Sequence, residues 1–102
     1  MERDASIEEN HSKLEAENAE RLKKALANLQ LVVESSITPK NIRKVLKDTM
    51  NALVDAHISV GVRAASAISI LEELSQDPNM PSFARVTMWS ALSNLESIRE
   101  QV

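Results

Sequence analysis

Apolar residues recur at helical spacing along four stretches of the chain. In the first stretch Leu22, Leu26 and Leu29 keep intervals of four and three residues, and polar side chains fill most positions between them. This pattern is typical of a helix that buries one face. We therefore predict four amphipathic helices, which span about residues 20–36, 39–57, 60–76 and 81–100.

Prolines mark two of the three connections between these helices and group the helices in pairs. Residues 77–81, between the third and fourth helices, contain two prolines. Pro78 cannot continue a helix because it lacks an N–H, whereas Pro81 suits the first turn of the next helix. Thr38 and Pro39 offer an N-cap and a first residue to the second helix. Helices joined by turns this short pack as antiparallel hairpins.

The two hairpins form a degenerate internal repeat with an offset of 42 residues. Six residues return in register, without a gap. Stacked hairpins bury a shared core, and two of them can close into a bundle. The predicted fold class is all-α, a compact four-helix bundle built from two helical hairpins. The matched residues are Arg21, Ala25, Leu29, Pro39, Arg43 and Leu53, which return as Arg63, Ala67, Leu71, Pro81, Arg85 and Leu95.

An acidic polar leader, residues 1–19, precedes this pattern. After Met1 its only large aliphatic residues are Ile7 and Leu14. Because so little apolar surface is available to offset the entropy of ordering, we expect a disordered or frayed leader, with a helical extension as the alternative. The chain then divides into the leader and a four-helix domain of residues 20–102, and the leader is dispensable for folding.

The composition fits a single helical domain of 102 residues. One glycine, one phenylalanine, one tryptophan and no tyrosine argue against a β-sheet, which favours aromatic and β-branched residues. The absence of cysteine excludes a disulfide framework. No apolar run is long enough to span a membrane, and the N-terminus resembles neither a secretory signal nor a transit peptide. We therefore expect a cytoplasmic protein without membrane contact.

The net charge of −3 is unevenly distributed along the chain. Residues 1–20 carry seven acids and two bases, residues 21–47 carry seven bases and one acid, and residues 48–102 carry seven acids and three bases. Four of the central bases share one face of the second helix, and we name them the basic stripe. They are candidate contacts for the phosphate backbone of RNA, although no aromatic residue for base stacking lies among them. The alternative is a solvated face. The basic stripe is Lys40, Arg43, Lys44 and Lys47.

The sequence offers little for catalysis or cofactor binding. His11 and His57 have no carboxylate at ligand spacing on one helix face, so no metal site is predicted. A single glycine provides no phosphate-binding loop. Adjacent Glu72 and Glu73 point about 100° apart on a helix and do not form an acid–base pair. We predict no catalytic residue, no cofactor and no small-molecule substrate, and therefore no enzyme.

Two arginines, Arg63 and Arg85, open the third and fourth helices. A positive charge at a helix N-terminus opposes the helix dipole and is mildly unfavourable. We expect a compensating ion pair with Glu72, Asp77 or a carboxylate of the leader, and the alternative is an anionic partner.

A second apolar strip on the fourth helix is a candidate protein interface. Phe83, Val86 and Trp89 follow one another at intervals of three residues beside the core positions, and a bundle of this size cannot easily bury both strips. Exposed apolar patches usually mark interfaces. The leading hypothesis is therefore a non-enzymatic interaction module that binds another protein or forms a homodimer. The alternative is an accessory factor that binds RNA or the ribosome through the basic stripe.

The segments that carry a family resemblance lie mostly in the second hairpin. They are Gly61-Val62-Arg63-Ala64-Ala65-Ser66-Ala67-Ile68-Ser69-Ile70-Leu71, Asp77-Pro78-Asn79-Met80-Pro81, Ala84-Arg85, Trp89 and Leu95-Glu96-Ser97-Ile98-Arg99, with Pro39-Lys40-Asn41-Ile42-Arg43 in the first hairpin. In these segments the chain resembles uncharacterised protein family 0147, over roughly residues 20–100. The resemblance implies a compact four-helix domain, an archaeal cytoplasmic source and no assigned activity, and it supplies no catalytic residues.

The chain departs from the pattern of that family at three places. Val60 stands where proline is usual, Ser35-Ser36 stand where Asp-Pro is usual, and the acidic leader is longer. These departures leave the geometry of the first turn open, but not the fold.

Overall fold

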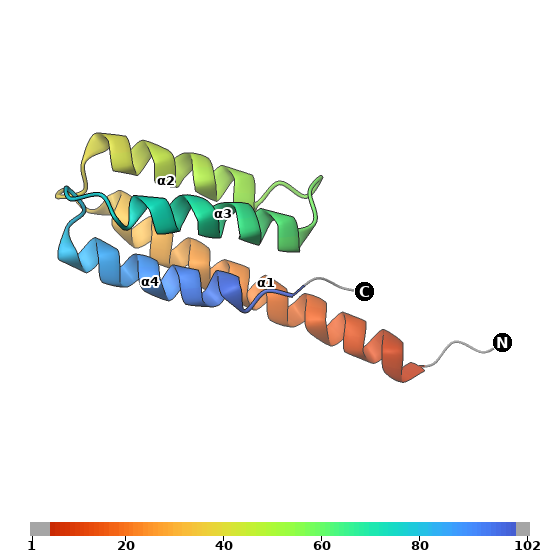
Figure 1. The fold of residues 1–102 in the computed structure, drawn as a ribbon. Coiled ribbons are helices and arrows are strands. Elements are labelled where there is room, and N and C mark those ends of the chain that lie inside the picture. The colour runs from red at the N-terminus through yellow and green to blue at the C-terminus, as the bar shows by residue number, and fades with distance from the viewer. Residues whose placement is uncertain (1–4, 100–102) are drawn as a thin grey trace.

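The computed structural model describes residues 5–99, with side chains from residue 11 onward. All regular structure in this range is helical (Figure 1). The prediction of an all-α fold with four helices is therefore confirmed. The elements in chain order are α1 (Ala5–Glu34), α2 (Lys40–Leu53), α3 (Val60–Leu74) and α4 (Ser82–Glu96).

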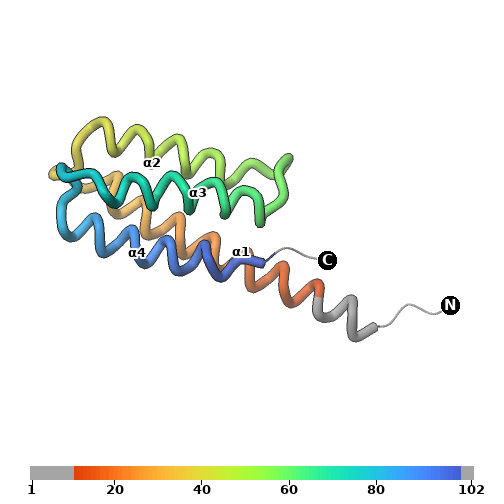
Figure 2. Tube along the Cα trace, viewed as in Figure 1, coloured from red at the N-terminus to blue at the C-terminus, as the bar shows by residue number. Residues whose placement is uncertain are grey.

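Each helix packs against two neighbours in a closed bundle. The main contacts join α1 to α2 and α4, and join α3 to α2 and α4. The short connections make sequential helices antiparallel, as the tube in Figure 2 shows. As a consequence, α2 and α4 lie at diagonal corners of the bundle.

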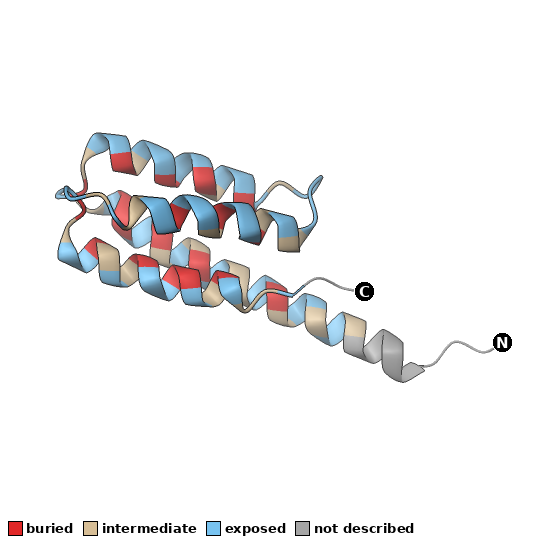
Figure 3. Ribbon diagram, in the orientation of Figure 1, coloured by how far each residue is buried: buried red, intermediate tan, exposed pale blue. Residues whose placement is uncertain are grey.

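The core is aliphatic and lies along the inner faces of all four helices (Figure 3). Leu71 and Leu95, which the internal repeat matches to Leu29 and Leu53, are both part of it. Burial of such side chains is the main force that stabilises the fold, at about 25 cal/mol for each Å² of apolar surface removed from water. The largest fully buried side chains are Leu29, Ile42, Leu46, Leu53, Leu71, Met88, Leu95 and Val32.

The first helix begins earlier than the hydrophobic pattern indicated. It is continuous from Ala5, so residues 5–19 form the helical extension and show no break near residue 20, where the four-helix domain was expected to start. This segment contains four Glu and three Ala, which are strong helix formers. It projects beyond the other helices (Figure 1), and the radius of gyration is 15.6 Å, compared with about 13 Å for a compact chain of 100 residues. Residues 1–4 lie outside the described part, and dispensability of the leader stays a prediction.

Asn18 attaches this extension to the other end of the chain. Its side-chain amide donates to the carbonyl oxygen of Arg99 at 2.7 Å, and its Oδ1 accepts the backbone N–H of Arg99 at 3.1 Å. Asn18 is buried although it is polar, and these two bonds satisfy its amide. Because Asn18 precedes Leu22 by four positions, it extends the buried face of α1 by one turn.

The remaining helix ends differ from the predictions by a few residues. The second helix ends at Leu53 instead of Asp55–His57, and α4 ends at Glu96, although Glu100 itself lies outside the described residues. Thr38 is not an N-cap. Its hydroxyl donates to the carbonyl oxygen of Val32 at 2.7 Å, where it satisfies the end of α1, and Pro39 takes the N-cap position.

Candidate interaction surfaces

The three turns between helices share one hydrogen-bond pattern, and each begins with a short polar residue. In the last turn Asp77 accepts the N–H of Met80 on its carbonyl oxygen at 3.1 Å and the N–H of Asn79 on Oδ1 at 2.8 Å. Asp55 accepts the same two bonds in the second turn. Ser35 accepts them in the first turn, where its hydroxyl oxygen takes the place of the carboxylate oxygen. Side-chain bonds of this kind imitate a backbone turn. The first turn therefore keeps the geometry of the others despite its serine.

An arginine follows each of these residues at an interval of eight and reaches back across the turn. Arg85 donates from Nε to the carbonyl oxygen of Ser75 at 3.0 Å. Arg63 donates from Nη1 to the carbonyl oxygen of Leu53 at 2.8 Å. Arg43 donates from Nη2 to two carbonyl oxygens of the first turn, both at 3.0 Å. Each guanidinium thus binds carbonyl oxygens at or just beyond the C-terminal end of the preceding helix.

This arrangement explains why positive charges open the helices. The last carbonyl groups of a helix have no partner inside it and carry partial negative charge. The arginine is unfavourable for its own helix but favourable for the preceding one, and hydrogen bonds to charged groups contribute about 1.5–3 kcal/mol each. The expectation of an ion pair with the carboxylate of Glu72 or Asp77 is therefore wrong. Arg85 does contact Asp77, but it donates to the backbone carbonyl oxygen of Asp77, at 3.3 Å.

The sequence contains a signal for this motif that the 42-residue offset revealed only in part. A Ser or Asp, a Pro or Ser four positions later and an Arg four positions after that recur three times. The first and third copies are 42 residues apart and match the internal repeat. The middle copy lies between them, so the repeating unit is a turn together with the first turn of the following helix. The three copies begin at Ser35, Asp55 and Asp77.

One member of the basic stripe on α2, Arg43, belongs to this turn motif, whereas the three lysines do not. Lys40, Lys44 and Lys47 are exposed, and Lys44 forms an ion pair with Asp48 at 3.3 Å. Arg43 is only partly exposed and bonds to the carbonyl oxygens of the first turn. The structure therefore leaves three lysines, instead of four bases, directed to solvent along this face.

The apolar strip on α4 lies outside the core. The exposed fractions of Phe83, Val86 and Trp89 are 39%, 58% and 56%. Phe83 and Trp89 are the only aromatic residues of the chain. The buried side of the same helix is formed by smaller or flexible apolar residues, including Ala84, Met88 and Leu95. Trp89 is therefore a surface residue and not part of the core.

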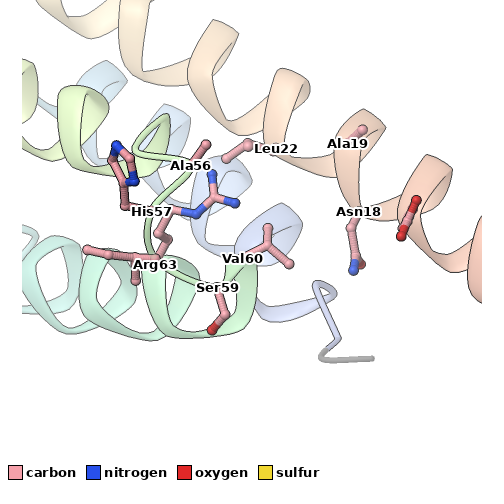
Figure 4. A pocket seen from close by; sticks show the side chains of 10 residues that line it. Asn18, Ala19, Leu22, Ala56, His57, Ser59, Val60 and Arg63 are labelled. Atoms are coloured by element: carbon pink, nitrogen blue, oxygen red, sulfur yellow. The ribbon is translucent and has the colours of Figure 1, made fainter. Parts of the chain in front are cut away.

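An open cavity of about 450 Å³ lies between α1 and the turn that precedes α3 (Figure 4). Glu15, Asn18, Ala19 and Leu22 form one wall, and residues 56–60 together with Arg63 form the other. Arg63 lines this cavity, and its bond to the carbonyl of Leu53 commits part of its guanidinium to the end of α2. The cavity therefore coincides with the second turn motif.

Side chains that could bind a metal ion do not cluster within the described residues. Within residues 5–99, no three histidine, aspartate or glutamate side chains that the structure describes gather closely enough to hold a metal ion. His57 is exposed in the second turn, where its backbone N–H donates to Asp55. None of the described helices is both long and apolar enough to cross a membrane.

Comparison with known proteins identifies relatives of matching length. A family model described as Uncharacterised protein family (UPF0147) matches residues 9–98. A UPF0147 protein of Metallosphaera sedula is 45% identical over 84 residues, which cover 82% of this chain and 94% of that protein. A UPF0147 protein of Sulfurisphaera tokodaii is 43% identical over the same shares of both chains. These relatives are archaeal, as the resemblance implied.

Two crystal structures share the fold. One is the protein of unknown function MMP1188, which is 38% identical, has a TM-score of 0.75 and matches 80% of this chain and 93% of its own. The other is a protein of uncharacterized family UPF0147 from Thermoplasma acidophilum, which is 27% identical, has a TM-score of 0.76 and matches 82% of this chain and 99% of its own. With a family model over most of its length and relatives above 40% identity, the chain belongs to family UPF0147.

Proposed function

We propose that this protein is a non-enzymatic helical interaction module, whose contact surface for protein is the outer face of α4. The observation that carries this proposal is the position of its two aromatic residues. Phe83 and Trp89 lie on the same helix and outside the core, which is aliphatic. Aromatic side chains dominate the energetics of cores and interfaces, and tryptophan is enriched among the residues that contribute most to binding.

The charge of α4 supports the same proposal. Between Ser82 and Leu95 the only charged residue is Arg85, and its guanidinium bonds to carbonyl oxygens at the end of α3. The exposed positions between these limits are therefore serine or apolar. Interface cores are depleted in charge in the same way. The proposal also places the module in the cytoplasm, which the absence of cysteine favours.

Site-specific photo-crosslinking tests this surface whatever the identity of the partner. A photoreactive residue replaces Val86, and in a matched control it replaces Val54, which is 57% exposed at the end of α2. Both variants are irradiated in a native lysate, with and without nuclease. We expect position 86 to form protein adducts that nuclease does not remove, and position 54 to form few.

Equal labelling at positions 86 and 54 would contradict the proposal, because the two side chains have nearly the same exposure. The absence of any protein adduct at position 86, including adducts between two copies of this chain, would contradict it as well.

A second candidate function is RNA or ribosome binding through Lys40, Lys44 and Lys47. Its support is the exposure of all three lysines on one helix face. Each phosphate contact to single-stranded RNA lowers the logarithm of the association constant by about 0.7 for each tenfold rise in salt. Binding that weakens steeply with salt and is lost when the three lysines are replaced by glutamine would favour this function. Binding that survives these replacements would exclude the stripe.

A further inference from the structure

The outer face of α4 carries a second helical seam. Its five positions are spaced four, three, four and three residues apart, and all five are exposed. An interval that averages 3.5 residues keeps one line of side chains directed at a neighbouring helix, as in a coiled coil. The inner positions of α4 already pack against the bundle, so this second line has no partner among the described helices. We name it the outer seam. Its residues are Ser82, Val86, Trp89, Ser93 and Glu96.

The outer seam is self-complementary when it is reversed. Trp89 is its midpoint, seven residues from Ser82 and seven from Glu96. An antiparallel copy related by a two-fold axis at Trp89 places Val86 of each chain near Ser93 of the other, a large side chain against a small one. The two indole rings meet at the axis, where aromatic pairs stack with centroids about 4.5–7 Å apart.

The ends of the outer seam are complementary in charge. Glu96 is the last residue of α4, and reversal places it beside the first turn of α4 in the second copy. That turn contains no acidic residue, and its N-cap, Pro81, makes no side-chain capping bond. A helix N-terminus carries partial positive charge, so a carboxylate there is favourable. A parallel arrangement would instead bring the two Glu96 carboxylates together.

The neighbouring surface places no charge in the way. Between Val60 and Leu71 of α3 the only charged residue is Arg63, which bonds to the end of α2. The outer positions of α3 that lie beside α4 are therefore uncharged along most of its length. The surface of α3 beside the outer seam therefore presents no charge that would repel a second copy, apart from exposed Glu72 and Glu73 in the last turn of α3.

We propose that the partner of the α4 surface is a second copy of this chain, which packs its own α4 antiparallel on the outer seam about a two-fold axis at Trp89. This inference rests on the proposed function and specifies its partner. A two-fold dimer is the commonest symmetric assembly, and it uses the same residues of both copies.

Disulfide mapping tests the geometry, since the chain contains no cysteine. Ser82→Cys and Glu96→Cys are prepared separately and oxidised alone or as a mixture. In the antiparallel pair, residues 82 of the two copies are separated by 14 helical positions, or about 21 Å. A disulfide requires Cα atoms within about 7 Å. We therefore expect a cross-linked dimer in the mixture and little from either variant alone. Val54→Cys mixed with Ser82→Cys is the matched control.

The other outcomes overturn the inference in distinct ways. Efficient cross-linking of Ser82→Cys with itself would show a parallel pair, and cross-linking with Val54→Cys would show contact elsewhere. A mixture that does not cross-link, together with a wild-type mass of one chain, would exclude self-pairing. In that case adducts of position 86 with a different protein would still support the interaction module, whereas their absence would remove both proposals.

Discussion

The second and fourth helices occupy equivalent positions in the internal repeat and diagonal corners of the bundle, yet their outer faces have opposite character. At the 42-residue offset, Lys44 on α2 corresponds to Val86 on α4, and Lys47 corresponds to Trp89. All four side chains are exposed. One helix therefore directs cations to solvent at the positions where the other directs apolar groups.

The inner faces of these two helices, in contrast, are alike. Leu53 on α2 and Leu95 on α4 correspond in the repeat, and both are buried. The arginines that open the helices also correspond and make equivalent bonds. Because the fold requires the same inner contacts from each hairpin, the difference is confined to positions that the fold leaves free. On our proposal, the exposed positions of α2 face water and the corresponding positions of α4 face a partner.

The largest effect on stability is expected at the buried positions that the two helices share. Leu53→Ala and Leu95→Ala each remove a buried side chain and leave a cavity, so each should lower the free energy of unfolding by about 2–5 kcal/mol. Urea denaturation measures both losses. A loss below about 1 kcal/mol at either site would show that the inner contacts of α2 and α4 are not equivalent.

The arginine caps should give a smaller and equal effect. Arg43→Met and Arg85→Met keep the aliphatic stem and remove the bonds to the carbonyl oxygens, so each should lower the free energy of unfolding by about 1.5–3 kcal/mol. Arg21→Met is the control, since Arg21 forms only a half-exposed ion pair with Glu17 at 3.7 Å. Losses equal to that of the control would contradict the capping role.

The smallest effect on stability is expected on the outer face of α2. Replacing Lys40, Lys44 and Lys47 with glutamine should change the free energy of unfolding by less than about 0.5 kcal/mol, because exposed charges contribute little. Thermal unfolding with circular dichroism measures the change. A large loss would mean that these lysines are structural, and the contrast with α4 would then have another cause.

The sequence predicted most of the bundle because its core positions are periodic. It gave the helical extension of α1 only as an alternative, since backbone propensity and the hydrogen bonds of Asn18 to Arg99 support this helix without producing an apolar stripe. It also misassigned Thr38, whose hydroxyl can bond forward to the next helix or backward to the last one. Only the path of the turn decides between these two acceptors.

The candidate surface was predictable only in part. The spacing of Phe83, Val86 and Trp89 identified a strip beside the core, but a position beside the core can be covered by a neighbouring helix. Exposure depends on how α1 and α3 approach α4, which the periodicity of α4 does not specify. The hydrogen bonds of Arg43 in the basic stripe were not predictable for the same reason, because its carbonyl partners lie in a turn that its own helix pattern does not include.

The mass of the protein in solution tests the central claim most directly. Light scattering over a concentration series is applied to the wild type, to Val86→Lys and to Val54→Lys, whose parent residues have nearly equal exposure. The account predicts that the wild type and Val54→Lys approach twice the 11.3 kDa of one chain, and that Val86→Lys remains at one chain with its helical signal unchanged. A wild-type mass of one chain at every concentration, or equal dissociation by both lysines, would contradict it.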